Sequence, residues 1–206
     1  MLIDIVVYDG VDELDALGPL EVLRSAGHAG ADLAVRLVTR ARQDAVVGAF
    51  GLRFLPDAVY QPGADILIVA GGGWTARAEV GAWGETQRGQ WLPLLHAAQR
   101  TSAVLAGVCT GTMLLAHAGV IGTRRASTHH TAWYDLIATG ATLVPDQVVD
   151  DGNLVTSGGV SSGMDLALWL VEREFSRGLA DKISLRMEYP RFRPRVADAG
   201  EPGGRM

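Results

Sequence analysis

The sequence has a single cysteine, Cys109, among its 206 residues. One thiol excludes a disulfide framework within the chain, and it excludes a metal site built from several cysteines. A lone thiol suits a reducing compartment, so we expect a cytoplasmic protein. No apolar run approaches the roughly 18–20 residues that a membrane-spanning helix needs, and the start MLIDIVVYDG carries acid and no base. We therefore expect neither a membrane segment nor a signal peptide.

Basic residues are too few and too scattered to form a nucleic-acid surface. The chain has 18 Lys and Arg against 23 Asp and Glu, for a net charge of −5. Arg191, Arg193 and Arg195 near the end are too few to make a basic stripe, so we expect no nucleic-acid partner. Hydrophobic residues at 48% support a full core. We expect one domain over residues 1–189, followed by a flexible tail over residues 190–206.

Short apolar runs alternate with stretches of helical periodicity along the chain. Buried strands are predicted at 3–8, 33–38, 66–70 and 103–108, hairpins at 45–54 and 143–156, and helices at 14–26, 85–100, 112–118, 164–175 and 179–189. We expect the regular part of the first helix to start at Gly18-Pro19, since proline suits a first helical turn. Strands that alternate with helices predict an α/β protein, a three-layer sandwich with a mostly parallel central sheet.

Cys109 is the leading candidate for a catalytic residue, because it lies between a predicted strand and a predicted helix. Helix N-terminal N–H groups favour a thiolate, so this position predicts a lowered thiol pKa. Gly107 and Gly111 allow a sharp turn that presents the sulfur. The alternative is a buried cysteine that acts only as a small hydrophobic residue.

Two other segments offer groups that would assist a nucleophile. Gly71-Gly72-Gly73 follows a strand, and its N–H groups could bind a developing negative charge; Trp74 comes next and is a candidate pocket wall. Asp15 lies in an apolar stretch, where burial would raise its pKa and make it a proton donor, although Asp12 and Glu13 compete for the inward position. Of His129 and His130, we favour His129 as a substrate-binding residue.

Five segments together resemble the ThiJ/PfpI superfamily, which is similar to the class I glutamine amidotransferase fold, a flavodoxin-like arrangement. They are LDALGP at 14–19, AGGG at 70–73, GVCTGTMLLAHAG at 107–119, ASTHH at 126–130 and VVDDGNLVTSGGVSSGMDLAL at 148–168. Asp15 and Thr110 make the chain most similar to the isocyanide hydratases within this superfamily. The PfpI-type peptidases carry histidine after the cysteine, which argues against a peptidase here. Ala70 replaces the proline that is common in this glycine turn.

The resemblance implies a role for each matching residue. Cys109 would attack the isocyanide carbon as a thiolate, and Asp15 would donate the proton and help to position water. The N–H groups of Gly72 and Thr110 would line the pocket, the Thr110 hydroxyl would bind water or substrate, and Gly71 would assist binding. The thioimidate would be hydrolysed to an N-substituted formamide without a cofactor. The resemblance also implies a homodimer.

Three other functions use the same residues. The thiolate could add to a small aldehyde, as in glyoxalases and deglycases, or Cys109 could be oxidised to a sulfinate as a stress sensor. The domain also resembles the sensor half of AraC-type transcription regulators. Those regulators carry a helix-turn-helix region of about 100 further residues, which makes a regulator the least favoured interpretation.

Overall fold

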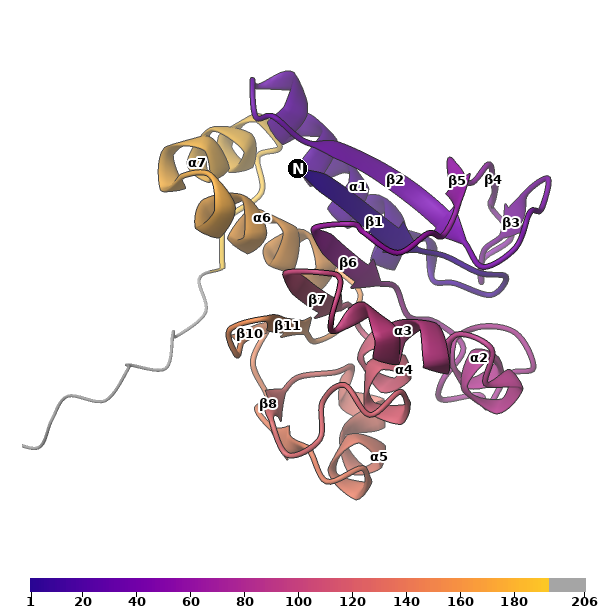
Figure 1. Cartoon of the computed structure of the whole chain (residues 1–206). Helices are drawn as coiled ribbons and strands as arrows, with labels where there is room; N and C mark the ends of the chain where they lie inside the picture. Colours follow the sequence, from indigo (N-terminus) through magenta and orange to yellow (C-terminus); the bar gives the residue numbers. More distant parts are fainter. Residues whose placement is uncertain (193–206) are drawn as a thin grey trace, which may run out of the picture.

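A seven-stranded sheet between two layers of helices forms the centre of the protein, in the computed structural model that describes residues 1–192 (Figure 1). The strand order is β10-β11-β7-β6-β1-β2-β5, and every neighbouring pair is parallel except β10 and β11. The strands are β1 (Leu2–Val6), β2 (Ala34–Thr39), β5 (Ala58–Val59), β6 (Ile66–Val69), β7 (Val104–Gly107), β10 (Val148–Asp150) and β11 (Leu154–Ser157). The predicted α/β sandwich is confirmed.

The helices divide into two groups that cover opposite faces of the sheet. Helices α1 (Glu13–His28), α6 (Ser162–Glu174) and α7 (Arg177–Arg186) pack together, and α3 (Leu92–Ala98) and α4 (Gly111–His117) pack together on the other side (Figure 1). Smaller elements decorate this frame: β3 (Val46–Val47), β4 (Arg53–Phe54), α2 (Ala82–Arg88), β8 (Arg125–Ala126), a 3₁₀ turn η1 (His130–Ala132), α5 (Trp133–Ala138) and β9 (Thr142–Leu143).

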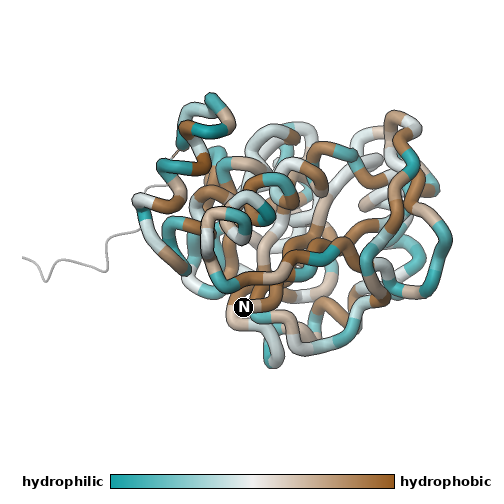
Figure 2. The backbone as a smooth tube through the Cα atoms, turned by 90° about the horizontal axis from the view of Figure 1, so that it is seen from above, coloured by the Kyte–Doolittle hydropathy of each residue, from teal (hydrophilic) through white to brown (hydrophobic). Residues whose placement is uncertain are grey.

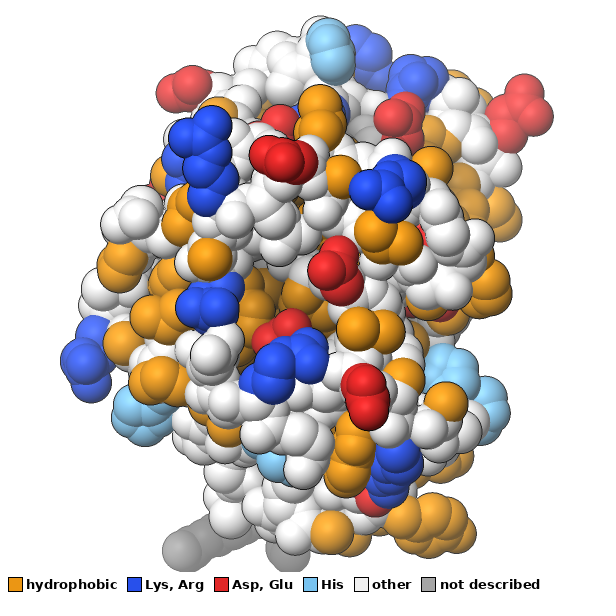
Figure 3. All heavy atoms as spheres, turned by 90° about the vertical axis from the view of Figure 1, so that its right-hand side faces the viewer, with side chains coloured by type: hydrophobic (Ala, Val, Ile, Leu, Met, Phe, Trp, Pro, Cys, Tyr) orange, Lys and Arg blue, Asp and Glu red, His pale blue; other side chains and the backbone are white. Residues whose placement is uncertain are grey.

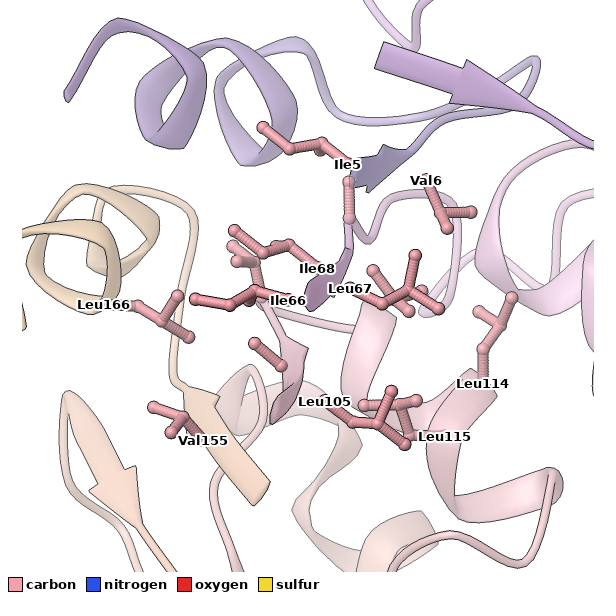
Figure 4. Packing of buried hydrophobic residues seen from close by; sticks show 14 of the residues in the cluster. Ile5, Val6, Ile66, Leu67, Ile68, Leu105, Leu114, Leu115, Val155 and Leu166 are labelled. Carbon is pink, nitrogen blue, oxygen red and sulfur yellow. The ribbon is translucent and has the colours of Figure 1, made fainter. Parts of the chain in front are cut away.

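The core follows from the strand sequences, which are apolar on both faces, as parallel strands between helices require. In Figure 4, Ile66 and Ile68 point towards Leu166 of α6, while Leu67 points towards Leu114 of α4. All five side chains are at most 2% exposed. Hydrophobic segments accordingly run through the middle of the molecule in Figure 2, and hydrophilic segments lie mainly in the outer turns.

Several predicted boundaries differ from the structure. Helix α1 is continuous from Glu13 and holds Pro19 inside it, so the predicted start at Gly18-Pro19 is wrong. The predicted helix at 85–100 is two helices, because Gly89 adopts a left-handed conformation with φ 67° that ends α2. Leu143 belongs to the small β8–β9 sheet, and the hairpin is formed by β10 and β11 alone.

The end of the described chain is held against α6 and α7, in contrast to the loose tail expected from residue 190. Arg191 is hydrogen-bonded to Glu172 and Asp181, and the buried Asp165 accepts hydrogen bonds from the Tyr189 hydroxyl (3.0 Å) and the Phe192 N–H (3.3 Å). Residues 193–206 of the predicted tail lie outside the described residues.

Two surface properties bear on the partners of the protein. Between residues 1 and 192, no helix combines the length and the apolar character needed to cross a membrane. On the face that Figure 3 shows, basic and acidic side chains are interspersed. That face therefore offers no basic stripe of the kind that binds a phosphate backbone.

Candidate active site

Cys109 lies on a strained turn between β7 and α4, here named the cysteine turn (residues 108–111). Its backbone φ is 54°, in the left-handed region that a side chain other than glycine rarely adopts. The Gly111 N–H closes the turn on the Val108 carbonyl at 2.8 Å. The thiol is free and 4% exposed. A strained conformation that persists in a packed core is typical of a functional residue.

The glycines around Cys109 are required by close packing. A Cβ on Gly111 would lie 2.0 Å from the Val69 carbonyl oxygen, and a Cβ on Gly107 would lie 2.6 Å from Thr112 Oγ1. The cysteine turn therefore passes directly over the end of β6. The same close approach brings it beside the glycine turn (residues 70–73), which follows β6.

Replacement of Gly111 with alanine is expected to destabilise the fold severely. The added Cβ meets backbone atoms, which cannot rotate away, so we expect a loss of about 3 kcal/mol or more. For a chain of this size that lowers the midpoint of thermal unfolding by about 10 °C. Circular dichroism against temperature measures this, with Gly178→Ala as the matched control, since no atom lies within 4 Å of a Cβ at Gly178. Equal midpoints for the two variants would contradict the packing argument.

Asp15 is the acidic residue whose side chain points into the protein. Asp12 and Glu13 instead accept hydrogen bonds from nearby backbone N–H groups. Asp15 is fully buried, and its Oδ2 accepts the Gly71 N–H at 3.1 Å. Its Oδ1 has no hydrogen-bond partner within the described chain. Asp12 caps α1 through the Leu14 N–H at 3.2 Å. Pro19 lacks an N–H, so the carbonyl of Asp15 receives no hydrogen bond from the next helical turn.

The Asp15 carboxyl and the Cys109 thiol lie near enough for each to shift the pKa of the other. Burial, and then the charge of Asp12, raise the pKa of Asp15 well above its usual range. Burial, and then the charge of Asp15, raise the pKa of Cys109, while the Thr110 N–H acts in the opposite direction. The predicted low thiol pKa is therefore wrong, because desolvation outweighs the helix N-terminus. Because a negative charge on either group disfavours a negative charge on the other, we expect the pair to resist the loss of both protons.

The backbone groups of Gly71 and Gly72 in the glycine turn already make hydrogen bonds within the protein. The Gly71 N–H donates to Asp15, the Gly72 N–H donates to Thr110 Oγ1 at 2.9 Å, and the Gly71 carbonyl accepts the Asp12 N–H at 3.0 Å. The expected open pocket at Gly72 is thus not what the structure contains. The Thr110 hydroxyl accepts from Gly72 and keeps its own proton for another acceptor.

The segment that carries His129 is tied to the cysteine turn by its neighbour. Thr128 donates through Oγ1 to the Cys109 carbonyl at 2.8 Å. His129 is half-buried, and its Nδ1 pairs with Thr131 Oγ1 at 2.8 Å. Burial, and then the charge of His130, lower the pKa of His129. His129 is therefore a neutral group beside the site, and its role in substrate binding stays a prediction.

Trp74 packs beneath the loop that follows the glycine turn and is 2% exposed. Its ring lies edge-on to Trp83 at 5.1 Å between centroids, and its indole N–H donates to Asp135 at 2.6 Å. This burial contradicts the expectation of a pocket wall. Trp74 instead anchors the 71–80 loop to α5, which carries Asp135.

Sequence reasoning missed Tyr8, whose buried hydroxyl donates to the Ala70 carbonyl in the glycine turn. It also missed Glu13, which accepts the N–H groups of Phe50 (2.8 Å) and Leu52 (3.2 Å) and so holds the β3–β4 loop against α1. Neither residue lies in a motif, and the partners are 37 to 62 positions away. Only the fold brings them together.

An apolar groove of about 480 Å³ opens beside the start of α1. Its lining residues are Asp12, Glu13, Leu14, Phe50, Leu52 and Val160. Phe50 is 84% exposed, and Leu14 and Leu52 are also exposed. Asp12 lines this groove and is also one of the charges that act on Asp15.

The sequence is similar to those of several known proteins. The model of the DJ-1/PfpI family matches residues 1–173. An isonitrile hydratase from Pseudomonas putida is 34% identical over 203 residues, covering 97% of this chain and 82% of its own. The HTH-type transcriptional regulator CdhR from Pseudomonas aeruginosa is 30% identical over 190 residues, covering 90% of this chain and 54% of the regulator.

The solved structures give the same answer for the fold. A THiJ/PfpI family protein from Pseudomonas syringae superposes with a TM-score of 0.82 at 24% identity, covering 96% of this chain and 78% of its own. The match spans the sheet, both helix layers and the cysteine turn. The chain belongs to the DJ-1/PfpI family.

Proposed function

We propose that the protein is a cysteine-dependent hydratase that converts small isocyanides to N-substituted formamides. The observation that carries the proposal is the placement of the buried Asp15 carboxyl and the strained Cys109 turn on the same glycine turn: Gly71 donates to Asp15, and Gly71 packs against Thr110, the residue after Cys109. Such a pair can move one proton between a nucleophile and a substrate without help from solvent. Similarity to an isonitrile hydratase supports the same choice of substrate.

The first step uses the proton of the pair. Isocyanide carbon accepts both a nucleophile and a proton, so Cys109 Sγ bonds to that carbon while the Asp15 carboxyl delivers to it the proton released by the thiol. The product is a thioimidate, R–N=CH–S–Cys109, and no atom is lost. Charge does not build up in the buried site, because the proton moves as the carbon–sulfur bond forms.

The second step consumes one water molecule. Asp15 takes a proton from the water as the water oxygen adds to the thioimidate carbon, and passes that proton to the nitrogen. Collapse of the adduct breaks the carbon–sulfur bond, the proton of the new hydroxyl group returns to the sulfur through Asp15, and R–NH–CHO is released. The Thr110 hydroxyl has a proton free to orient this water. The proposal places the enzyme in the cytoplasm, which keeps a lone thiol reduced.

The test compares isocyanide with an aldehyde substrate. Wild-type protein is given cyclohexyl isocyanide or methylglyoxal, and formamide or lactate is measured by chromatography. The proposal predicts formamide production, with methylglyoxal consumed far more slowly. Rapid lactate formation without formamide would replace the hydratase assignment with glyoxalase chemistry. Inactivity on both substrates while Cys109 is reduced would reject both activities.

We also propose that the protein forms a homodimer through the apolar groove. Leu14, Phe50 and Leu52 expose a patch of a kind that usually marks an interface. We take a second copy as the partner, because the patch lies at the start of α1, the helix that carries Asp15. Cys109 would then react in a site shielded from bulk water.

Phe50→Asp is expected to give a monomer, because a carboxylate in an apolar interface has no partner. Light scattering after gel filtration measures the mass of each species. Leu185→Asp is the matched control, since Leu185 is 80% exposed on α7 and is not part of the groove. A dimer that survives Phe50→Asp, or a wild-type monomer, would contradict the placement of the interface.

A further inference from the structure

Tyr8 lies outside the reaction described above, yet it contacts the same peptide unit that holds Asp15. The Tyr8 hydroxyl donates to the Ala70 carbonyl, and the N–H of the following residue, Gly71, donates to Asp15 Oδ2 at 3.1 Å. The carbonyl and the N–H belong to one amide, between Ala70 and Gly71. A hydrogen bond at one end of an amide therefore connects Tyr8 to a hydrogen bond at the other end.

We propose that Tyr8 is a positioning residue for the Asp15 carboxyl, acting through the Ala70–Gly71 amide. A donor on an amide carbonyl polarises the amide and makes its N–H a stronger donor, by roughly 10–30% for each bond in a chain. The stronger N–H stabilises the Asp15 carboxylate over its protonated form. Tyr8 thereby sets how readily Asp15 gives up and recovers the proton that it shares with Cys109. This role rests on the proposed function only for its effect on turnover.

The packing around this amide leaves it little freedom. A Cβ on Gly71 would lie 2.6 Å from both the N and Oγ1 of Thr110, so the peptide is pressed against the cysteine turn. Tyr8 is 4% exposed and lies two residues after the end of β1, whose register with β6 is fixed over four residue pairs.

The surroundings of Tyr8 favour its protonated, donor form. Burial, followed by the charges of Asp15, Glu85 and Cys109, raises the pKa of Tyr8 well above its usual value. The groups that act on Asp15 itself are Asp12, Cys109 and the Gly71 N–H, and His129 reaches it only through Asp12.

The test is the titration of Asp15 in Tyr8→Phe. With aspartate labelled at the side-chain carboxyl carbon, ¹³C NMR follows Asp15, and Asp15→Asn identifies its signal. Loss of the hydroxyl weakens the Gly71 donor, so the Asp15 midpoint is expected to rise by a few tenths of a pH unit. Tyr60→Phe is the matched control, because Tyr60 is also buried but packs on Trp91, away from the glycine turn.

A second measurement is expected to shift the Asp15 midpoint in the opposite direction, and it does not require that Tyr8→Phe folds. Uniform replacement of the four tyrosines by 3-fluorotyrosine gives more acidic phenols and stronger donors, so the Asp15 midpoint is expected to fall. An Asp15 midpoint that is unmoved in folded Tyr8→Phe, or in the fluorinated protein, would overturn the proposal even if turnover declined. Because the NMR readout needs no substrate, it decides the role of Tyr8 even if isocyanides prove not to be substrates.

Discussion

Replacement of Cys109 with alanine is expected to abolish formamide production, with a loss of about 10⁴-fold or more in kcat. No other cysteine exists in the chain to take its place. The neighbouring Thr110 hydroxyl is engaged by the Gly72 N–H and has no adjacent base that would make it a nucleophile. The loss should therefore reach the rate of the reaction without enzyme.

The measurement is the initial rate of formamide formation at several isocyanide concentrations. Cys109→Ser separates chemistry from shape, because serine keeps the size of the side chain but is a far weaker nucleophile at neutral pH. Both variants should bind substrate and fail to convert it. Appreciable turnover by Cys109→Ala would remove the thiol from the mechanism and leave Asp15 acting on water directly.

Replacement of Asp15 with asparagine is expected to lower kcat by about 10²- to 10⁴-fold, the usual worth of a positioned acid–base group. Asparagine can still accept the Gly71 N–H, so the glycine turn should keep its place. What is lost is the shuttled proton. Asp12→Asn is the matched control: asparagine caps α1 as well as aspartate does, and a far smaller loss is expected.

The pH dependence follows from the shared proton. The wild-type rate should be bell-shaped, because activity requires the pair to hold one proton and falls when a second is taken up or the last is lost. The acidic limb should lie above the usual range of a carboxyl group, since burial raises the pKa of Asp15. In Asp15→Asn this limb should disappear. A limb that persists unchanged in the variant would assign it to another group.

The stability of Asp15→Asn provides an independent check on the sign of this shift. A raised carboxyl pKa means that the folded state favours the protonated form, whereas the unfolded chain ionises freely near pH 7. Asp15 therefore costs folding free energy as pH rises above the pKa of the unfolded state. Asparagine carries no such cost, so the variant should unfold at an equal or higher temperature at pH 7.

The sequence predicted the parts of the fold that depend on local pattern. The apolar runs of β1, β6 and β7 and the periodicity of α4, α6 and α7 carry their own signal. Two of the predictions that failed involved single residues: Pro19 lies inside a helix that it was expected to begin, and Gly89 ends a helix that was expected to continue. At Pro19 the fold outweighed the local preference, whereas Gly89 follows the usual preference of glycine for a left-handed helix end.

The sequence indicated which residues belong to the candidate site, but it did not indicate the contacts that those residues make. Cys109 and Asp15 were identified from motifs, and the glycines from the need for a sharp turn. The raised pKa of Cys109 was not, because it depends on burial by segments far along the chain. The partners of the Gly72 N–H and the Tyr8 hydroxyl were hidden for the same reason, as strand register alone sets them.

Alkylation of Cys109 in the native protein tests the central claim most directly. Because the chain has one cysteine, iodoacetamide can modify only one thiol, and intact mass spectrometry gives the modified fraction at each time. The account predicts that turnover of cyclohexyl isocyanide falls in direct proportion to that fraction and reaches zero at full modification, with the fold unchanged by circular dichroism. Fully alkylated protein that still forms the formamide would contradict catalysis by Cys109.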